Sequence, residues 1–357
     1  NRNGWQLSPE YTIGDLLVVR VGAGIGNSCV VDIDEEFSIY VSLTHVTLKA
    51  GFYNYYFNFV FNSPKFIEEC NLITKHGGGV GNLNVKDFER FKFPIPPLPE
   101  QHQIVSFLDH KTQKIDKLIE KTEQKIELLK EKRTALINHC VTKGLNPDVE
   151  MKDSGVPARA EQREAGREWI GEIPSGWDTK KVKYLGSIKS GDGVVNTELD
   201  DDKEYPVYGG NGIMGYYDNF NREETILVIG RVGEKCGNVH LVKEKCWVTD
   251  NSLILDLWNK EIYDWAYYSL DTRELNTLRN QNTQPLITST LLKNESIPYP
   301  PENEQTQIVS FLDHKTQKID ITIEKETQRI ELLKEYRQSL ISEVVTGKID
   351  LSADRQV

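Results

Sequence analysis

The chain has 357 residues, and its 54 acidic residues outnumber its 43 lysines and arginines, which gives a formal net charge of -11. This length suffices for two or three domains with cores of their own. The acidic balance argues against a protein that binds nucleic acid through its total charge alone. The five cysteines are scattered without a CxxC spacing, which excludes a disulfide framework and a cysteine zinc site and indicates a reducing compartment. No apolar run reaches the roughly 18 residues that a membrane span requires.

Residues 1–98 are predicted to form a first domain rich in strands. Leu16–Gly22 and Phe37–Lys49 carry the β-branched and aromatic residues typical of strands, and the aromatic stretch Phe52–Cys70 is expected to contain a helix. The chain begins at Asn1, and this domain has fewer residues before its glycine-rich turn than its later counterpart has. We therefore expect the front of the first domain to be incomplete.

RVGAGIGN at Arg20–Asn27 is similar to the glycine-rich turn that binds a dinucleotide. Asn27 stands where the third glycine of that fingerprint belongs, and the residues after it are typical of a strand, not of the helix that would hold a pyrophosphate. A later stretch, RVGEKCGN at Arg231–Asn238, lacks the middle glycine. The favoured interpretation is a tight turn with glycines at positive φ, and the cofactor site is the alternative.

A second glycine-rich stretch, Lys75–Asn84, lacks the GK[ST] ending of a phosphate-binding loop. It corresponds to Arg279–Thr290, which is rich in amides. Amide side chains can bind the edge of adenine, and cationic side chains can bind phosphate or guanine. This loop pair is therefore predicted to lie at a recognition surface. The alternative is a flexible connector. The candidate contact residues are Lys75, His76, Gly78, Asn82, Asn84, Arg279, Asn280, Gln281, Asn282 and Gln284.

Residues 99–143 are predicted to form one long helix. Between Ile115 and Cys140, mainly apolar residues recur at steps of four and three, the period of a seam between packed helices. Gly144 and Pro147 are expected to end the helix. A second apolar row, which is expected to bury a further face, comprises Leu118, Leu128, Ile137 and Val141.

Residues 144–167 are polar and rich in charge, and they are predicted to form a linker. A second β-rich domain is predicted over 168–299, a second long helix over 300–346 and a polar tail over 347–357. Within the second domain, Pro206–Asn219 combines glycines and tyrosines, as a contact surface or a packed turn does. Its candidate contact residues are Tyr208, Asn211 and Tyr216.

The two predicted helices are copies of one sequence. QIVSFLDHKTQKID occurs at Gln103–Asp116 and again, unchanged, at Gln307–Asp320, and each copy follows a proline cluster and Glu-Gln. A period of this length indicates a duplicated domain with its connector, not a solenoid. Nearly identical helices with diverged domains imply two equivalent surfaces that recognise different ligands. The candidates for the seam and for subunit docking are Gln101, Ile115, Ile126, Arg133, Gln305, Ile319, Ile330 and Arg337.

The seven histidines show no metal-ligand spacing, and no nucleophile motif stands out. We therefore expect no catalytic residue, no metal site and no cofactor in this chain.

The arrangement resembles the specificity subunit of type I restriction–modification systems. The resemblance rests on PIPPLPEQHQIVSFLDHKTQKID from Pro94 with its second copy, on EWIGEIPSGWDTKKVKYLG at Glu168–Gly186, and on PVYGGNGIMGYYD and RVGEKCGN. It implies an α+β fold in which two β-rich target recognition domains are joined by two long antiparallel coiled-coil helices with pseudo-two-fold symmetry. The first half departs from the pattern, because it lacks a counterpart of EWIGEIPSGW.

The resemblance also implies a non-catalytic subunit that reads a bipartite site in double-stranded DNA. Two methyltransferase subunits and a restriction subunit would dock on the helices and would carry S-adenosylmethionine, ATP and Mg. The protein would act in the prokaryotic cytoplasm without membrane contact. Three alternatives stay open: a methylation-only system or silent exchange cassette, a coiled-coil scaffold with two non-DNA binding modules, and an enzyme that uses the Gly22–Asn27 turn.

Overall fold

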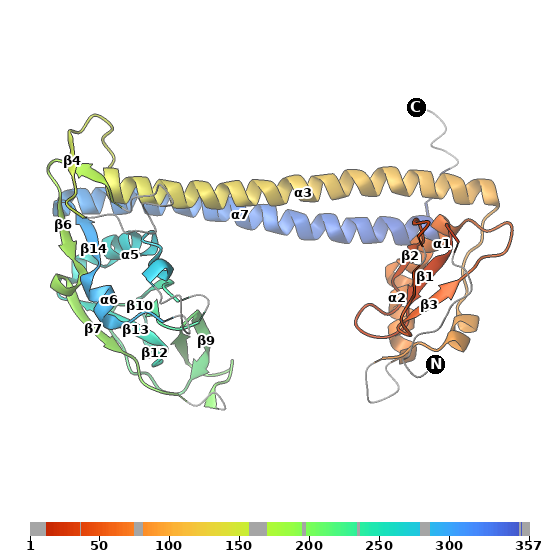
Figure 1. Cartoon of the computed structure of the whole chain (residues 1–357), viewed down its shortest axis with the longest axis horizontal. Helices are drawn as coiled ribbons and strands as arrows, with labels where there is room; N and C mark the ends of the chain where they lie inside the picture. The colour runs from red at the N-terminus through yellow and green to blue at the C-terminus, as the bar shows by residue number, and fades with distance from the viewer. Residues whose placement is uncertain are drawn as a thin grey trace. The chain divides into compact units, whose positions relative to one another are not determined.

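In the computed structural model (Figure 1), the described residues are 12–35, 37–74, 81–156, 170–194, 198–233, 236–278, 286–349 and 351. The chain divides into two compact units. Unit 1 comprises Asn1–Ile126 and Glu324–Val357, and unit 2 comprises Glu127–Ile323. Each unit therefore contains one β-rich domain and a part of each long helix. No helix in the described residues is long and apolar enough to cross a membrane.

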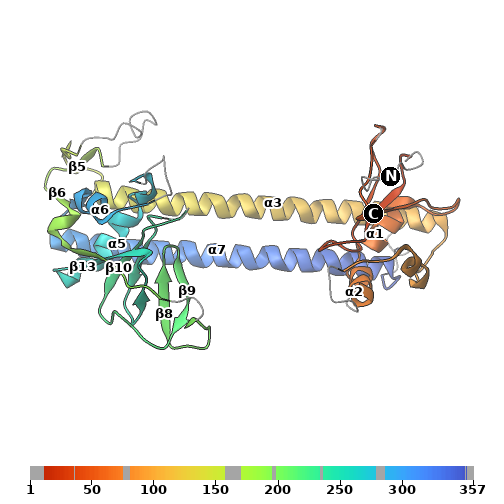
Figure 2. The same ribbon diagram turned by 60° about the horizontal axis from the view of Figure 1, so that its bottom comes forward.

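The long helices are α3 (Leu98–Lys143) and α7 (Glu302–Val345), and they run antiparallel within each unit (Figure 2). In unit 1, Asp116 accepts from Arg337 Nε at 2.9 Å, and in unit 2 Asp320 accepts from Arg133 Nε at 2.9 Å. These two ion pairs occupy equivalent positions in the repeat. The fold class that the sequence predicts, two β-rich domains joined by two long antiparallel helices, is confirmed.

Each long helix ends at a glycine, as the sequence predicts. Gly144 adopts φ +77° and donates its N–H to Cys140, while Gly347 adopts φ +73° and donates to Val344. A glycine in this left-handed conformation closes the last turn without the steric cost that a Cβ would add.

The prediction of a second buried row on the first helix is wrong for two of its four members. Leu118 is 42% exposed and Leu128 is 65% exposed. A pair of helices buries only a narrow stripe along its seam, and the exposure of these leucines shows that no other part of the described chain covers them. Ile137 and Val141 are buried because the Trp177 region of unit 2 covers them.

In unit 1, three antiparallel strands lie in the order β2-β1-β3 beside two helices. The elements are β1 (Leu16–Val19), β2 (Ser28–Val30), β3 (Leu43–Val46), α1 (Asn54–Phe61), α2 (Pro64–Thr74) and the 3-10 helix η1 (Val85–Arg90). The predicted strand over Phe37–Lys49 is thus much shorter. The helix expected within Phe52–Cys70 is two helices, because Pro64 lacks the N–H that a continuing helix needs and begins a new one.

Unit 2 contains a four-stranded sheet in the order β11-β10-β13-β7 and a three-stranded sheet in the order β12-β8-β9. The four-stranded sheet comprises β7 (Gly186–Ser190), β10 (Ile226–Gly230), β11 (Val239–Val242) and β13 (Ser252–Leu257). The three-stranded sheet comprises β8 (Tyr205–Gly209), β9 (Gly212–Tyr217) and β12 (Trp247–Val248). Two short pairs are β6 (Asp178–Lys181) with β14 (Ser296–Tyr299) and β4 (Met151–Asp153) with β5 (Glu172–Pro174). The helices are α5 (Tyr263–Asp271) and α6 (Ser289–Asn294), with the 3-10 turns η2 (Val182–Tyr184), η4 (Lys260–Ile262) and η5 (Leu275–Leu278).

β10 is buried along its whole length because a core lies on each side of it. Leu227 and Ile229 belong to the core shared with α5, while Ile226 and Val228 face the smaller core shared with Tyr208. Alternate side chains of a strand point to opposite faces, so the unbroken apolar run ILVIG serves both cores.

The predicted linker 144–167 contains a strand. β4 pairs antiparallel with β5 through Met151–Pro174, Lys152–Ile173 and Asp153–Glu172. The hydrophobic pattern does not predict this strand, because two of its three side chains are charged. The strand is held by backbone hydrogen bonds to one neighbour, as an edge strand can be.

Candidate functional site

The RVG turn of unit 1 is a hairpin turn between β1 and β2. Gly22 and Gly26 adopt φ +100° and +91°. Gly26 N–H donates to Val19 at 2.9 Å, and Val19 N–H donates to Asn27 at 2.8 Å. The favoured interpretation of a tight turn is confirmed, and the strand that follows supplies no helix N-terminus for a dinucleotide.

The RVG turn of unit 2 has the same backbone geometry. Gly233 and Gly237 adopt φ +86° and +95°, Gly237 N–H donates to Gly230 at 2.8 Å, and Gly230 N–H donates to Asn238 at 2.9 Å. The two turns thus share the conformation of these glycines and their backbone hydrogen bonds.

The arginine that opens each turn joins three segments of its unit. Arg20 N–H donates to Ser42 at 2.8 Å and its carbonyl accepts from Leu83 at 2.8 Å. Arg231 N–H donates to Asn251 at 3.0 Å and its carbonyl accepts from Ile287 at 2.9 Å. We call each meeting point a loop junction: junction 1 comprises Arg20, Val21, Ser42, Asn82 and Leu83, and junction 2 comprises Arg231, Val232, Asn251, Leu286 and Ile287.

Each loop junction places the end of a predicted recognition loop beside an RVG turn. Val21 bridges Asn82, and Val232 bridges Leu286. Asn82 is exposed there, and Asn84 is exposed at the N-cap position of η1. The other loop candidates, Lys75, His76, Gly78, Arg279, Asn280, Gln281, Asn282 and Gln284, lie outside the described residues.

The β8–β9 hairpin packs on junction 2. A Cβ on Gly210 would lie 2.9 Å from the carbonyl oxygen of Val232 and 3.3 Å from that of Asn251, so only glycine allows this approach. Asn211 is exposed at the hairpin tip beside Gly210, and Tyr216 is half-buried in β9. Asn211 is therefore held next to the end of the loop that precedes Leu286.

The expectation for Tyr208 needs correction. Its side chain is only 9% exposed and packs in the small core with Val228 and Val248, so its ring is not presented to a partner. β8 is buried from Pro206 to Gly209, so Tyr208 lies within the domain. The same hairpin exposes Ile213 and Met214 instead.

Each proline turn that precedes a long helix is held by two side-chain donors, of which the glutamine is equivalent in the two copies. Gln101 Nε2 donates to the Pro96 carbonyl at 2.9 Å, and Gln305 Nε2 donates to the Pro300 carbonyl at 2.8 Å. The carbonyls of Pro94 and Pro298 accept from the Tyr56 hydroxyl and from Trp265 Nε1, respectively. Both glutamines are buried, so they hold the chain at the helix start and are not exposed docking contacts.

The remaining seam candidates lie between the helices. Ile115, Ile126 and Ile330 are buried, and Ile319 is half-buried. The exposed apolar side chains on the two helices, which the sequence reading did not select for docking, include Leu118, Leu128, Ile321, Leu332 and Tyr336. Leu128 and Leu332 are equivalent in the repeat and are equally exposed.

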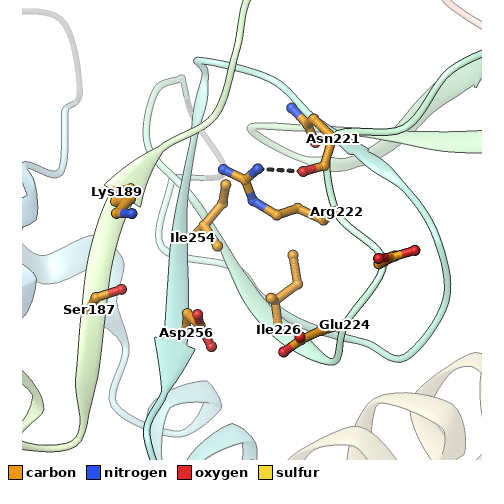
Figure 3. A pocket seen from close by; sticks show the side chains of 9 residues that line it. Ser187, Lys189, Asn221, Arg222, Glu224, Ile226, Ile254 and Asp256 are labelled. Atoms are coloured by element: carbon orange, nitrogen blue, oxygen red, sulfur yellow. Dashed lines mark hydrogen bonds between the residues drawn. The ribbon is translucent and has the colours of Figure 1, made fainter.

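Unit 2 also has a surface cavity of about 310 Å³ on the four-stranded sheet (Figure 3). Lys189 and Arg222 line it together with Glu224 and Asp256, and Arg222 Nη1 donates to the carbonyl of Asn221. Because both signs of charge line the cavity, it is not a simple anion site. Within the residues that the structure describes, no group of three His, Cys, Asp or Glu side chains is placed to hold a metal ion.

The pKa of one titratable group in each unit is shifted by its surroundings. Burial alone would raise the pKa of Asp15, but hydrogen bonds from Thr12 and His45 outweigh it and lower that pKa. Burial lowers the pKa of His240, whose ring lies beside Tyr208 and under the hairpin glycine Gly212.

Comparison with known proteins agrees with this architecture. The family model for the type I restriction modification DNA specificity domain matches residues 8–128 and 174–332. The specificity subunit of the type I restriction enzyme EcoprrI from Escherichia coli is 30% identical over 140 residues, 37% of this chain and 35% of that protein. The MjaVIII specificity subunit from Methanocaldococcus jannaschii is 24% identical over 322 residues, 82% of this chain and 70% of that protein.

Solved structures show the same fold. A chain from a study of complex assembly and conformational transition of the type I R-M system superposes with a TM-score of 0.73 at 16% identity, covering 96% of this chain and 86% of that one. The HsdS subunit from Thermoanaerobacter tengcongensis gives a TM-score of 0.53 at 15% identity, covering 96% and 84%. With both of its domains matched by the family model, the chain belongs to the type I restriction–modification DNA specificity family.

Proposed function

We propose that the two units of this specificity subunit bind the two halves of a bipartite site in double-stranded DNA. One observation carries the proposal: the two loop junctions share their backbone hydrogen bonds, whereas the side chains around them differ. A common backbone frame with different side chains is what two readers of different short sequences need, because base edges are read by side chains.

The long helices are the proposed docking surface for modification and restriction subunits. Leu128 and Leu332 occupy equivalent positions in the two copies and are equally exposed. Exposed apolar side chains on a helical surface are typical of a protein interface, and two equivalent positions suit two copies of one partner. The chemistry would reside in these partners, with S-adenosylmethionine for methylation and ATP with Mg for translocation and cleavage.

The net charge of -11 supports a shared role in DNA binding. Affinity for DNA depends largely on cations that neutralise phosphates. The chain alone is therefore expected to bind DNA weakly, and the modification subunits are expected to supply part of the phosphate contacts.

A genome-wide map of adenine methylation tests the proposal. Cells would express the chain with its cognate methyltransferase subunit, and control cells would express the methyltransferase alone. The expected result is a new split motif, and replacing residues 168–299 by another recognition domain should change only one half of it. Absence of new methylation from an assembled complex would favour the scaffold or the silent cassette.

A further inference from the structure

Arg20 and Arg231 stand out among the arginines that the structure describes. Five others, Arg90, Arg133, Arg273, Arg329 and Arg337, each pair with a carboxylate, and Arg222 donates to the backbone carbonyl of Asn221. Neither Arg20 nor Arg231 forms such a pair within the described residues, and the Nε atom of each is buried without a hydrogen-bond partner. In a chain with an excess of acidic residues, two unpaired guanidinium groups at repeat-equivalent positions call for an explanation.

The backbone of each arginine is fixed while its side chain keeps free donors. Two backbone hydrogen bonds fix the main chain of each residue inside its loop junction. Both side chains are half-buried, and Arg231 Nη1 makes only a 3.5 Å contact to Ser190 Oγ. A buried donor without a partner is costly in a folded protein, and an anionic ligand that accepts from the guanidinium would offset this cost.

We propose that Arg20 and Arg231 each bind a backbone phosphate of the DNA half-site that their unit contacts. The inference rests on the proposed function and deepens it. The planar guanidinium presents two parallel N–H donors that match a phosphate. Because the residues around the junctions differ while the arginine is the same, its ligand must be a group that both half-sites contain, and the phosphate backbone is that group in any sequence.

The proposal distinguishes these arginines from the loop residues. Phosphate contacts position a protein on the duplex, and base contacts select the sequence. Each junction then supplies a sequence-independent anchor directly beside the loop that reads the bases. A guanine contact by the same fork would instead require a guanine in both half-sites.

The test is the salt dependence of DNA binding by the complex of the chain with its methyltransferase subunit. Fluorescence anisotropy on a duplex with the mapped motif would compare wild type with Arg20→Ala and Arg231→Ala. Each substitution should weaken binding about tenfold and make the slope of log K against log salt shallower by about 0.9. Matched controls are Arg90→Ala and Lys243→Ala, which remove exposed cations paired with Asp87 and Asp264, and neither should change the slope.

Neutral methylphosphonates locate the contact. One that replaces the contacted phosphate in the half-site of unit 1 should weaken the wild type about tenfold and leave Arg20→Ala unaffected. Arg20→Lys keeps the charge and should retain the slope with a smaller loss of affinity. This variant separates phosphate binding from misfolding, as does an unchanged melting temperature of the alanine variants.

The possible failures are distinguishable. If the wild-type complex binds no split motif, the proposed function is wrong. If it binds the motif but both alanine variants keep the wild-type slope, only the phosphate inference is overturned. A methylation map that shifts to a new half-site motif in the Arg20 variant would also overturn it, because the arginine would then read a base.

Discussion

At the scale of single residues, the two buried glutamines explain why each long helix follows prolines and Glu-Gln. The carbonyls of Pro96 and Pro300 lie just before the first helical turn, where no backbone N–H of the described residues donates to them, and an acceptor that is removed from water requires a donor. Gln101 and Gln305 supply that donor in the two units. The repeated proline and Glu-Gln sequence therefore specifies a side-chain hydrogen bond as well as a turn.

Substitution of these glutamines should destabilise the two units unequally. Gln101 Oε1 also accepts from the Tyr53 N–H at 2.8 Å, so Gln101→Leu leaves two partly buried backbone groups without their partner. We expect it to lower the free energy of unfolding of unit 1 by about 1–3 kcal/mol, and Gln305→Leu to have a smaller effect on unit 2. Urea titration measures both, with the exposed Gln103→Ala as control, and equal effects would contradict this account.

His240 should make the stability of unit 2 depend on pH. Burial lowers its folded-state pKa below the ordinary value of 6.5. The unfolded chain then binds the proton more readily, so this contribution to stability is complete above pH 6.5 and is lost as the pH falls toward the folded-state pKa. The urea midpoint of unit 2 should fall between pH 7 and pH 5 by more in wild type than in His240→Gln, and parallel curves would exclude the effect.

At the scale of elements, the RVG turn of unit 2 offers a matched pair of glycines. Both Gly233 and Gly237 have positive φ, but a Cβ on Gly233 would meet open space, whereas one on Gly237 would lie 2.4 Å from Asn276 N. Gly233→Ala should cost about 1–2 kcal/mol from the backbone conformation alone. Gly237→Ala should cost clearly more, and thermal unfolding compares them. Equal losses would show that the close approach to Asn276 relaxes freely.

The exposed leucines of the helices allow docking to be separated from folding. Leu128→Glu and Leu332→Glu should each change the stability of the chain by less than about 0.5 kcal/mol, because both side chains are largely exposed. Each should remove one of two methyltransferase subunits, which native mass spectrometry of the assembled complex measures. Retention of both subunits by the double variant would place the docking surface elsewhere.

Sequence periodicity predicted these elements unevenly. The ends of α3 and α7 follow from Gly144 and Gly347, whose local conformation stops a helix. β4 and the exposure of Leu118 depend on which segments pack nearby, which a local pattern does not contain. Tyr208 shows the same limit, because a tyrosine in a glycine-rich stretch suits either a core or a surface.

At the scale of the whole molecule, the duplication was the most reliable signal in the sequence. It predicted that equivalent residues make equivalent contacts, and the paired loop junctions confirm this for the RVG turns. Arg20 and Arg231 were not selected as candidates, although both copies of RVG contain them. The motif alone does not show this role, because the lack of a partner for each arginine Nε depends on which side chains the fold brings near it.

If the helices set the distance between the half-sites, lengthening both should widen the gap in the recognised motif. One heptad inserted after Ile126 of α3, with one after Glu326 at the facing position of α7, keeps the seam period and adds about 10 Å. At 3.4 Å per base pair this corresponds to about three base pairs. Methylation mapping should show unchanged half-sites with a longer gap, and an unchanged gap would exclude the helices as the spacer.

The ion pairs across the seam give the duplicated sequence a property that neither copy has alone. Arg133 of the first copy meets Asp320 of the second, and Arg337 of the second meets Asp116 of the first. Each repeat therefore supplies the ionic partners of the other. A substitution of one of these residues in one copy removes an ion pair from the unchanged residue in the other copy. Where the copies differ, this equivalence is lost: Lys125 pairs with Glu326 of the other helix, whereas the equivalent Arg329 pairs with Glu326 of its own helix, because the first copy has Thr122 where the second has Glu326. The identity of the two stretches is then explained by the contacts between them, because each copy limits the substitutions that the other can accept.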